Sequence, residues 1–243
     1  MCTVSTLSML TPYTSTRGGC QEVAGTKAGY HHGDLCAALI DAGLQLTRTG
    51  GPEALTIREA TRRVGVSPNA AYRHFADREA LLGAVSIAIQ DRMAARMLKP
   101  VNRRGSAQTR ARNQLRAVGL GYIEFALDEP GWFAVAFFGG SARLDGGEAK
   151  LGPPHRPSRS DLTAQGDDWV SPPFQALVDA LDAMTDAGVL QPKRRAGAEW
   201  PCWSAAHGFA ELALHGPLRG TSRHELESLA SRTVDDVISG LVG

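Results

Sequence analysis

Twenty residues that begin at Thr56, TIREATRRVGVSPNAAYRHF, constrain the fold of this chain more than any other stretch. Thr56 is a favourable N-cap, and Glu59 three residues later completes the pattern of a capping box at the start of a helix. Gly65 ends that helix, because glycine takes the left-handed conformation without steric cost. Ser67 is a favourable N-cap for a second helix, and Pro68 suits its first position. The stretch therefore predicts two short helices joined by a tight turn.

The second helix, predicted to run about two turns to Phe75, has side chains that suit the major groove of DNA. Its first turn carries small groups that allow close approach to base edges, and its exposed remainder carries Tyr72, Arg73 and His74. Two capped helices also occur in helical domains that bind no DNA, so the pattern alone is moderate support. A local excess of arginine over carboxylate adds to it. The charges concerned are Arg58, Arg62, Arg63, Arg73 and Arg78 against Glu59 and Asp77.

The residues of this stretch divide into two predicted roles. Side chains that reach phosphates position a protein on the duplex, whereas side chains that reach base edges read its sequence. The predicted phosphate contacts are Thr56, Arg58, Tyr72, His74 and Arg78. The predicted base-reading residues are Ser67, Asn69, Ala70 and Arg73, and Pro68 is expected beside them at the DNA surface.

The longer run LTIREATRRVGVSPNAAYRHFADREALL resembles the N-terminal DNA-binding domain of the TetR family of bacterial transcriptional regulators. The likeness covers roughly residues 30–90, and two positions depart from it: Ala60 is smaller than the usual branched residue, and Thr61 replaces a usual alanine. The resemblance implies an all-α fold, with a three-helix helix-turn-helix domain followed by a larger helical domain for ligand binding and dimerisation. The matching residues are Leu55 to Arg58, the Gly65-Val66-Ser67 turn, Tyr72, His74, Phe75, Asp77 to Glu79, Leu81 and Leu82.

Composition limits how such a chain can bind DNA. Its 243 residues carry a net charge of only +1, so DNA binding must come from a local patch. Its four cysteines are far apart and form no CxxC pair, which argues against a disulfide framework or a zinc site and fits a reducing cytoplasm. No run of about 18 apolar residues occurs, so no membrane span is expected.

The pattern along the chain predicts four parts. Residues 1–29 are rich in Ser, Thr and Gly and are expected to form a disordered arm. Residues 30–76 form the predicted helix-turn-helix domain, 77–99 a connecting helix, and 100–243 the effector-binding and dimerisation domain. Within the last part, residues 139–168 are rich in Gly, Pro and charge and are expected to form a mobile loop.

Aromatic residues are concentrated in the C-terminal part, above all in the run from Trp132 to Phe138. Such a run is either protein core or the wall of an apolar ligand cavity, and the sequence leaves both interpretations open. The TetR resemblance places an effector pocket among these helices. The predicted ligand-binding residues are Tyr122, Phe125, Trp132, Phe133, Phe137, Phe174, Trp203 and His207.

The stretch Trp200–Gly216 resembles the ligand-binding domain of a TetR subfamily marked by a Trp-Ser…His-Gly pattern. His207, Glu211 and His215 follow one another at helical spacing and form a stripe that could hold a metal or an acid–base pair. A lone helix cannot close such a site. The chain also has no GxSxG, HExxH or glycine-rich phosphate loop, so no catalytic residue, metal or cofactor is predicted. Together with Ser222–Leu241, this stretch is expected to form a twofold homodimer.

These observations predict a cytoplasmic, ligand-responsive regulator. It would bind a palindromic double-stranded operator as a homodimer, act as a repressor, and be released by a small, largely apolar effector. Two alternatives stay open. One is a DNA-binding protein that needs no effector, and the other is a helical enzyme or metal protein that uses His207, Glu211 and His215.

Overall fold

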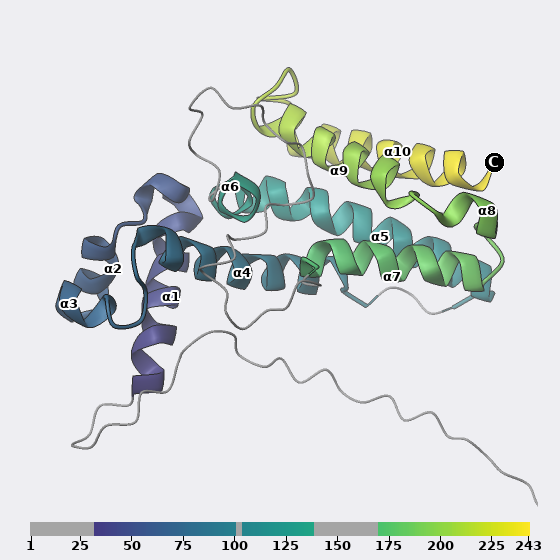
Figure 1. Cartoon of the computed structure of the whole chain (residues 1–243). Helices are drawn as coiled ribbons and strands as arrows, with labels where there is room; N and C mark the ends of the chain where they lie inside the picture. Colours follow the sequence, from purple (N-terminus) through teal and green to yellow (C-terminus); the bar gives the residue numbers. More distant parts are fainter. Residues whose placement is uncertain (1–31, 101–103, 139–169) are drawn as a thin grey trace, which may run out of the picture.

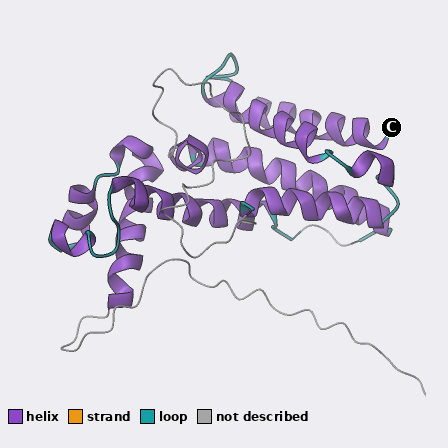
Figure 2. Cartoon of the chain, in the orientation of Figure 1, coloured by secondary structure: helices purple, strands orange, loops and turns teal. Residues whose placement is uncertain are grey.

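The structure is a computed structural model that describes residues 32–100, 104–138 and 170–243. Within these ranges every regular element is a helix, as Figure 2 shows, which confirms the predicted all-α fold class. The predicted arm (1–29) and the predicted loop (139–168) lie outside the described residues. None of the helices in the described ranges is long and apolar enough to span a membrane.

The first elements gather at one end of the molecule (Figure 1). They are α1 (His32–Gly50), η1 (Pro52–Ala54), α2 (Ile57–Val64) and α3 (Pro68–Ala71). The long helix α4 (Arg78–Met97) leaves this group and runs into the rest of the chain. Because α4 contacts α1 on one side and α5, α6 and α7 on the other, it joins the two parts of the molecule. The predicted division at residues 76 and 99 stays a prediction.

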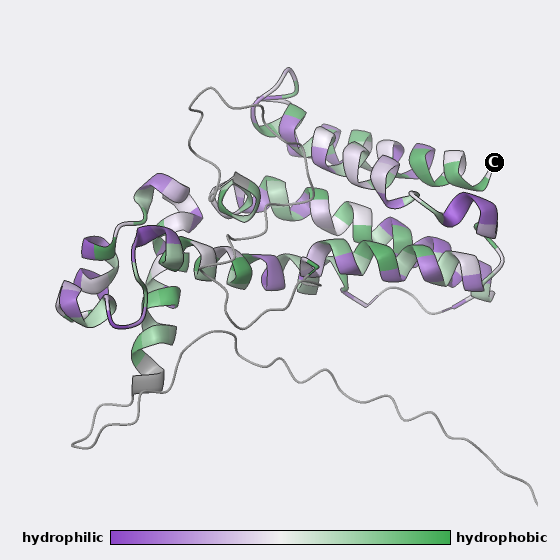
Figure 3. Ribbon diagram, viewed as in Figure 1, coloured by the Kyte–Doolittle hydropathy of each residue, from purple (hydrophilic) through white to green (hydrophobic). Residues whose placement is uncertain are grey.

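The remaining helices form a bundle around α5 (Ala107–Asp128), which contacts α4, α6, α7, α9 and α10. The other members are α6 (Pro130–Phe138), α7 (Pro172–Asp186), α8 (Pro192–Arg195), α9 (Glu199–Leu214) and α10 (Arg223–Val242). Figure 1 shows α9 and α10 side by side along one flank of the bundle. Figure 3 shows hydrophilic residues concentrated on α8 and around α2 and α3, while hydrophobic residues dominate α6 and much of α7.

Local capping explains where the early helices begin and end. The Thr56 hydroxyl accepts a hydrogen bond from the Glu59 backbone N–H at 3.1 Å, and Gly65 takes the left-handed conformation with φ of 77°. Asp77 caps α4 in the same way, accepting from the Ala80 N–H at 2.8 Å. The second half of the predicted capping box is wrong, since the Glu59 carboxylate turns forward to the Arg62 guanidinium at 2.9 Å.

The second helix of the pair is shorter than predicted. The α-helix α3 ends at Ala71, and the chain continues to Phe75 through turns instead of a second helical turn. The Ala71 carbonyl accepts from both the His74 and the Phe75 N–H at 2.9 Å, which tightens the chain at this point. Phe75 is thereby buried in the core, while the Ser67 side chain makes no capping hydrogen bond.

Two cysteines, Cys36 and Cys202, lie in the described part of the chain. Cys36 is buried in α1. Cys202 in α9 is the free cysteine of the described part of the chain.

A joint between α1 and α6 holds the two parts of the molecule together. The Arg48 guanidinium forms a two-pronged ion pair with the Glu129 carboxylate, with N···O distances of 2.7 and 2.5 Å. At Gly131 the backbones meet so closely that an added Cβ would lie 2.3 Å from the Arg48 carbonyl oxygen. The glycine is therefore required by a close approach between two helices.

Replacing this glycine tests the joint. We expect Gly131→Ala to lower the free energy of unfolding by about 1–3 kcal/mol, because the new methyl group would push backbone atoms apart. The matched control is Gly83→Ala in α4, where nothing lies within 4 Å of an added Cβ. That control should raise stability by up to about 1 kcal/mol through helix propensity alone. Urea denaturation followed by circular dichroism measures both, and equal effects of the two substitutions would contradict the close approach.

Candidate DNA-binding surface and ligand site

The helix α3 and the turn after it present one open face and one buried face. Ala71 and Phe75 point into the core. The residues on the open face are Ser67, Pro68, Asn69, Tyr72 and Arg73, which are exposed, and Ala70 and His74, which are half-buried. Tyr72 is 53% exposed, a large value for an aromatic side chain. The predicted base-reading residues thus lie beside Tyr72 and His74 on this face, whereas Thr56, Arg58 and Arg78 lie outside α3 and its turn.

The two positions that depart from the TetR pattern are accommodated without cost to the interior. Ala60 is fully buried between α2 and its neighbours. Thr61 is also buried, and its hydroxyl donates to the carbonyl oxygens of Ile57 at 2.8 Å and Arg58 at 3.0 Å. Because a buried hydroxyl is costly only when it lacks a partner, Thr61 fits this core.

Arginines line the outer side of α2, and the Glu59 carboxylate accepts hydrogen bonds from two of them. Glu59 accepts from Arg62 at 2.7 and 2.9 Å and from Arg63 at 3.5 Å. The hydrogen bond from Arg62 is the main reason that the pKa of Glu59 falls to about 2, and Arg63 adds to it. Arg58 is exposed beside them. Part of the basic excess read from the sequence is therefore neutralised within α2 itself.

Arg78 has a different environment from the one predicted. Its guanidinium donates to the backbone carbonyl oxygens of Leu55 at 2.7 Å and Pro52 at 2.5 Å, and it pairs with Glu79 at 2.6 Å. These contacts brace the segment before α2 against the start of α4. The sequence predicted a phosphate contact, but the structure directs this side chain toward the protein's own backbone.

Aromatic rings surround His207 in the interior of the C-terminal bundle. The Tyr122 hydroxyl lies 2.7 Å from His207 Nδ1, and the rings of Phe133 and Phe137 lie 5.5 Å from the imidazole between centroids. Trp203 stacks nearly parallel to the imidazole at 6.4 Å. Phe174 extends the group through Trp203, with the centroids 5.6 Å apart. The aromatic cluster, meaning these six residues, unites α5, α6, α7 and α9.

Burial sets the charge state of the polar pair at the centre of this cluster. Burial lowers the pKa of His207 below its ordinary value of 6.5, against a smaller opposing effect of the Glu211 carboxylate. Burial likewise raises the pKa of Tyr122 well above 10. Both groups are therefore neutral near pH 7, and the cluster holds a neutral hydrogen bond between apolar rings.

Phe125 and Trp132 are predicted ligand residues that lie outside the aromatic cluster. They stack on each other with centroids 6.3 Å apart. The Trp132 indole donates to the Leu44 carbonyl oxygen at 2.8 Å, and the Arg48 and Arg92 guanidinium groups lie 5.2 and 5.7 Å from its ring. These contacts place Trp132 at the joint between α1 and α6.

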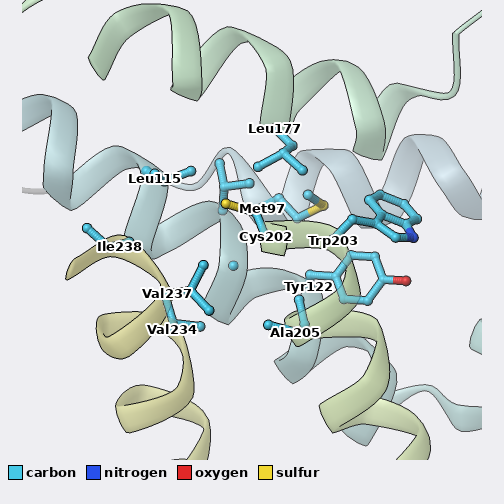
Figure 4. Close-up of a pocket in the computed structure, with 13 residues that line it drawn as sticks. Met97, Leu115, Tyr122, Leu177, Cys202, Trp203, Ala205, Val234, Val237 and Ile238 are labelled. Atoms are coloured by element: carbon cyan, nitrogen blue, oxygen red, sulfur yellow. The ribbon is translucent and has the colours of Figure 1, made fainter. Parts of the chain in front are cut away.

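A cavity opens beside the aromatic cluster, between α5, α9 and α10 (Figure 4). Tyr122 and Trp203 line it, but the other predicted ligand residues do not. The sequence missed the aliphatic and small residues that form most of the wall, because their spacing reads as ordinary helix core. These are Met97, Leu115, Val118, Gly119, Leu177, Cys202, Ala205, Ala206, Val234, Val237 and Ile238.

The stripe considered for metal or acid–base chemistry does not converge into a site. His215 Nδ1 lies 3.0 Å from a Glu211 oxygen at the exposed end of α9, whereas His207 faces Tyr122 in the interior. Among the described residues, no group of three or more His, Cys, Asp or Glu side chains is arranged to hold a metal ion.

Two family models match the chain. The model described as bacterial regulatory proteins of the tetR family matches residues 39–85, which span α2, α3 and parts of α1 and α4. The model described as the tetracyclin repressor-like C-terminal domain matches residues 115–237, about half of the chain. No curated protein matches the chain.

Solved structures with a similar fold are distant in sequence. A protein of unknown function from Rhodococcus sp. RHA1 has a TM-score of 0.60 at 23% identity, with 89% of this chain and 100% of that chain covered. A TetR variant from Acinetobacter baumannii AYE in complex with minocycline has a TM-score of 0.54 at 20% identity, covering 84% and 94%. A tetR family regulatory protein from Rhodococcus RHA1 gives 0.52 at 18% identity, covering 86% and 97%.

The half-buried imidazole of His207 makes the free energy of unfolding depend on pH in a defined direction. A lowered pKa means that the folded protein binds a proton less readily than the unfolded chain. The stabilisation is therefore complete above pH 6.5 and is lost as the pH falls below it. We expect His207→Gln to flatten the stability profile between about pH 8 and pH 5, compared with wild type.

His224→Gln is the control for this prediction, because His224 is exposed on α10. It should leave the difference in stability between neutral and acid solution unchanged. Urea denaturation at several pH values measures all three proteins. A profile for His207→Gln that parallels the wild type would contradict the buried, neutral imidazole.

Proposed function

Because the chain belongs to the TetR family of bacterial transcriptional regulators, we propose that it is a homodimeric repressor of a palindromic operator, released by a small apolar effector. The observation that supports DNA binding most is the open face of α3 and the turn after it. A helix-turn-helix protein inserts the second helix of the pair into the major groove. Here the exposed residues of α3 are small, and Tyr72 and Arg73 follow in the turn after it, where they are accessible to a duplex.

The roles proposed on this surface follow the geometry. Arg73 is exposed and lies next to small residues, so it is placed to reach a base edge or the adjoining phosphate. Thr56, Arg58, Tyr72 and His74 are proposed to contact phosphates on either side of the groove. Ser67, Pro68, Asn69 and Ala70 are proposed to face the bases. Arg78 is assigned to bracing the backbone at Leu55, since its guanidinium is already bonded there.

A second copy of the chain is proposed to cover the outer face of α9 and α10. Trp200 and Leu212 on α9 are 48% and 46% exposed, and Leu229 on α10 is 36% exposed. Gly208 lies between the first two on the same face of α9, and no atom of the described residues is within 4 Å of a Cβ added there. A glycine inside a helix costs about 1 kcal/mol relative to alanine. Its place is explained if the partner's helix approaches at this point.

The helix α6 is proposed to carry the effector signal to the DNA-binding surface. Phe133 and Phe137 of α6 belong to the aromatic cluster. Trp132, one residue away, is bonded to α1, and the Ala136 carbonyl accepts from Gln90 of α4 at 3.1 Å. A ligand that moves this helix would shift both α1 and α4. Release of the operator requires that the effector bind the shifted form more tightly than the DNA-bound form.

Removing Arg73 tests the proposed DNA surface. We expect Arg73→Ala to weaken operator binding by about 1–3 kcal/mol and to reduce discrimination against altered duplexes. The operator is the duplex that wild-type protein selects from a random pool, and gel-shift titrations measure affinity for it and for a scrambled duplex. Arg112→Ala, an exposed arginine on the first turns of α5, is the control for net charge. Unchanged affinity and selectivity in Arg73→Ala would count against this role.

A bulky side chain at Gly208 tests the dimer. We expect Gly208→Leu to convert the dimer into a monomer, because the new side chain occupies the space proposed for the partner's helix. No atom of the described residues lies within 4 Å of a Cβ at this position, so circular dichroism should show an unchanged helix content. Gly83→Leu on α4 is the matched control, since a Cβ there is equally unobstructed. Analytical ultracentrifugation decides, and a dimer of equal strength in both variants would refute the proposed face.

A further inference from the structure

One side chain joins the two ends of the segment that carries α2 and α3. This segment runs from Leu55, directly before the cap of α2, to Arg78, the first residue of α4. The Arg78 guanidinium donates from Nε to the Leu55 carbonyl oxygen at 2.7 Å and from Nη2 to the Pro52 carbonyl oxygen at 2.5 Å. These two hydrogen bonds are called the Arg78 clamp below. Because they connect residues 23 and 26 positions apart, they close α2 and α3 into a loop.

The residues that accept the Arg78 clamp are fixed to the rest of the molecule. Pro52 belongs to η1, which contacts both α1 and α6. Leu55 is fully buried, and Gly50 lies so close to η1 that an added Cβ would be 2.5 Å from the Ala54 Cβ. Figure 1 shows α2 and α3 at the end of the molecule opposite α8. The Arg78 clamp therefore ties the start of α4 to a fixed point, and α2 and α3 extend from that point.

The geometry of the Arg78 clamp requires an arginine and not only a positive charge. The hydrogen bonds of α2 begin at its N-cap, where the Thr56 carbonyl oxygen accepts from the Ala60 N–H at 3.0 Å. The Leu55 carbonyl oxygen precedes this cap, and the Arg78 side chain supplies its donor. A guanidinium is a planar fork that holds two acceptors in fixed directions, whereas a lysine ammonium is a compact charge on a flexible stem. Lysine at this position would therefore keep the charge and lose the defined geometry.

The charge of Arg78 is already compensated within the protein. Its Nη1 donates to the Glu79 carboxylate at 2.6 Å, so each of the three guanidinium nitrogen atoms bonds to a protein oxygen. A phosphate that took one of these positions would replace a hydrogen bond that the folded chain already has. Arg78 is thus placed to act on DNA binding through the backbone before α2 and not through a phosphate.

We propose that Arg78 is a positioning residue for DNA recognition, which holds α2 and α3 in the orientation that fits the major groove without contacting DNA itself. Closing a loop removes arrangements that the enclosed helices would otherwise sample, so less order has to be imposed on binding. Contacts to base edges need this defined orientation, whereas the attraction to phosphates is independent of sequence. That DNA is the partner rests on the function proposed above, but the closure of the loop does not.

Hydrogen exchange of the free, full-length protein is the first test. Arg78→Lys keeps the charge, and Glu79→Gln removes the ion pair but leaves the Arg78 clamp. We expect the backbone amides of α2 and α3 to exchange at least about tenfold faster in Arg78→Lys, because two hydrogen bonds from a charged donor are weakened. Glu79→Gln should exchange at wild-type rates, and the amides of α9 and α10 should be unchanged in both variants. Mass spectrometry of peptides measures the rates. Unchanged exchange in Arg78→Lys, or equal acceleration in both variants, would overturn the proposal.

DNA affinity is the second test, measured by gel shift at several salt concentrations with the selected duplex and a scrambled duplex. We expect Arg78→Lys to bind the selected duplex about tenfold more weakly, roughly the loss of one good base contact. Its affinity for the scrambled duplex and its salt dependence should match wild type, because the charge is kept. Arg58→Ala, which removes a proposed phosphate contact, should instead weaken both duplexes alike and lower the salt slope by about 1. Full affinity of Arg78→Lys for the selected duplex, or an equal loss for both duplexes, would contradict the positioning role.

A measurement on wild-type protein needs no variant to fold. In nitrogen-15 NMR of the free protein and of its complex with the selected duplex, the Arg78 Nε–H should exchange slowly with water in both states. Rapid exchange in the complex would mean that the guanidinium leaves the Leu55 carbonyl oxygen on binding, which overturns the proposal.

The tests separate this proposal from the function on which it rests. If wild-type protein selects no duplex, operator binding fails and the role in DNA recognition fails with it, while faster exchange in Arg78→Lys still supports the closed loop. If wild-type protein selects a duplex that Arg78→Lys binds equally well, operator binding stands and the positioning role is refuted.

Discussion

The close contact between α1 and α6 is the constraint on which the rest of the structure depends. Gly131 lets the two backbones touch, and the Arg48–Glu129 ion pair holds the contact at its edge. An exposed ion pair alone contributes little stability. Here it accompanies a buried close approach and the hydrogen bond of the Trp132 indole to the Leu44 carbonyl. This combination fixes the orientation of the first helices relative to the bundle, so a displacement of α6 cannot leave α1 in place.

The short helix α6 also takes part in a second set of contacts. Phe133 and Phe137 are part of the aromatic cluster around His207, while Trp132 is part of the joint. Packed interiors respond to a change in volume by moving as units, because their side chains already fill the space. The hydrogen bond between Tyr122 and His207 links α5 to α9 within this packing. The aromatic cluster is thus a connection between helices as much as an apolar interior.

Local signals in the sequence predicted the helix boundaries well, because a cap involves residues three or four positions apart. Thr56 and Gly65 act as predicted, whereas the Ser67 side chain makes no capping hydrogen bond, and the all-α fold follows from many such signals. Contacts between distant segments could not be read in this way. Nothing near Arg78 in sequence shows that the Pro52 carbonyl lies within its reach, and nothing near Trp132 shows that it faces Leu44 of α1. The members of the aromatic run divide between two places, because Trp132 contacts α1 while Phe133 and Phe137 belong to the aromatic cluster.

The interpretation of that run as core or as ligand wall can now be argued from geometry. The rings of the aromatic cluster lie 5.1 to 6.4 Å apart between centroids, the spacing of aromatic pairs in contact, so the cluster fills its own space. The opening lies on the other side of Tyr122 and Trp203, among aliphatic residues. These two side chains therefore form a shared wall between the cavity and the aromatic cluster. A displacement of Tyr122 at this wall would strain its hydrogen bond to His207 and, through Phe133 and Phe137, act on α6 and on the joint with α1.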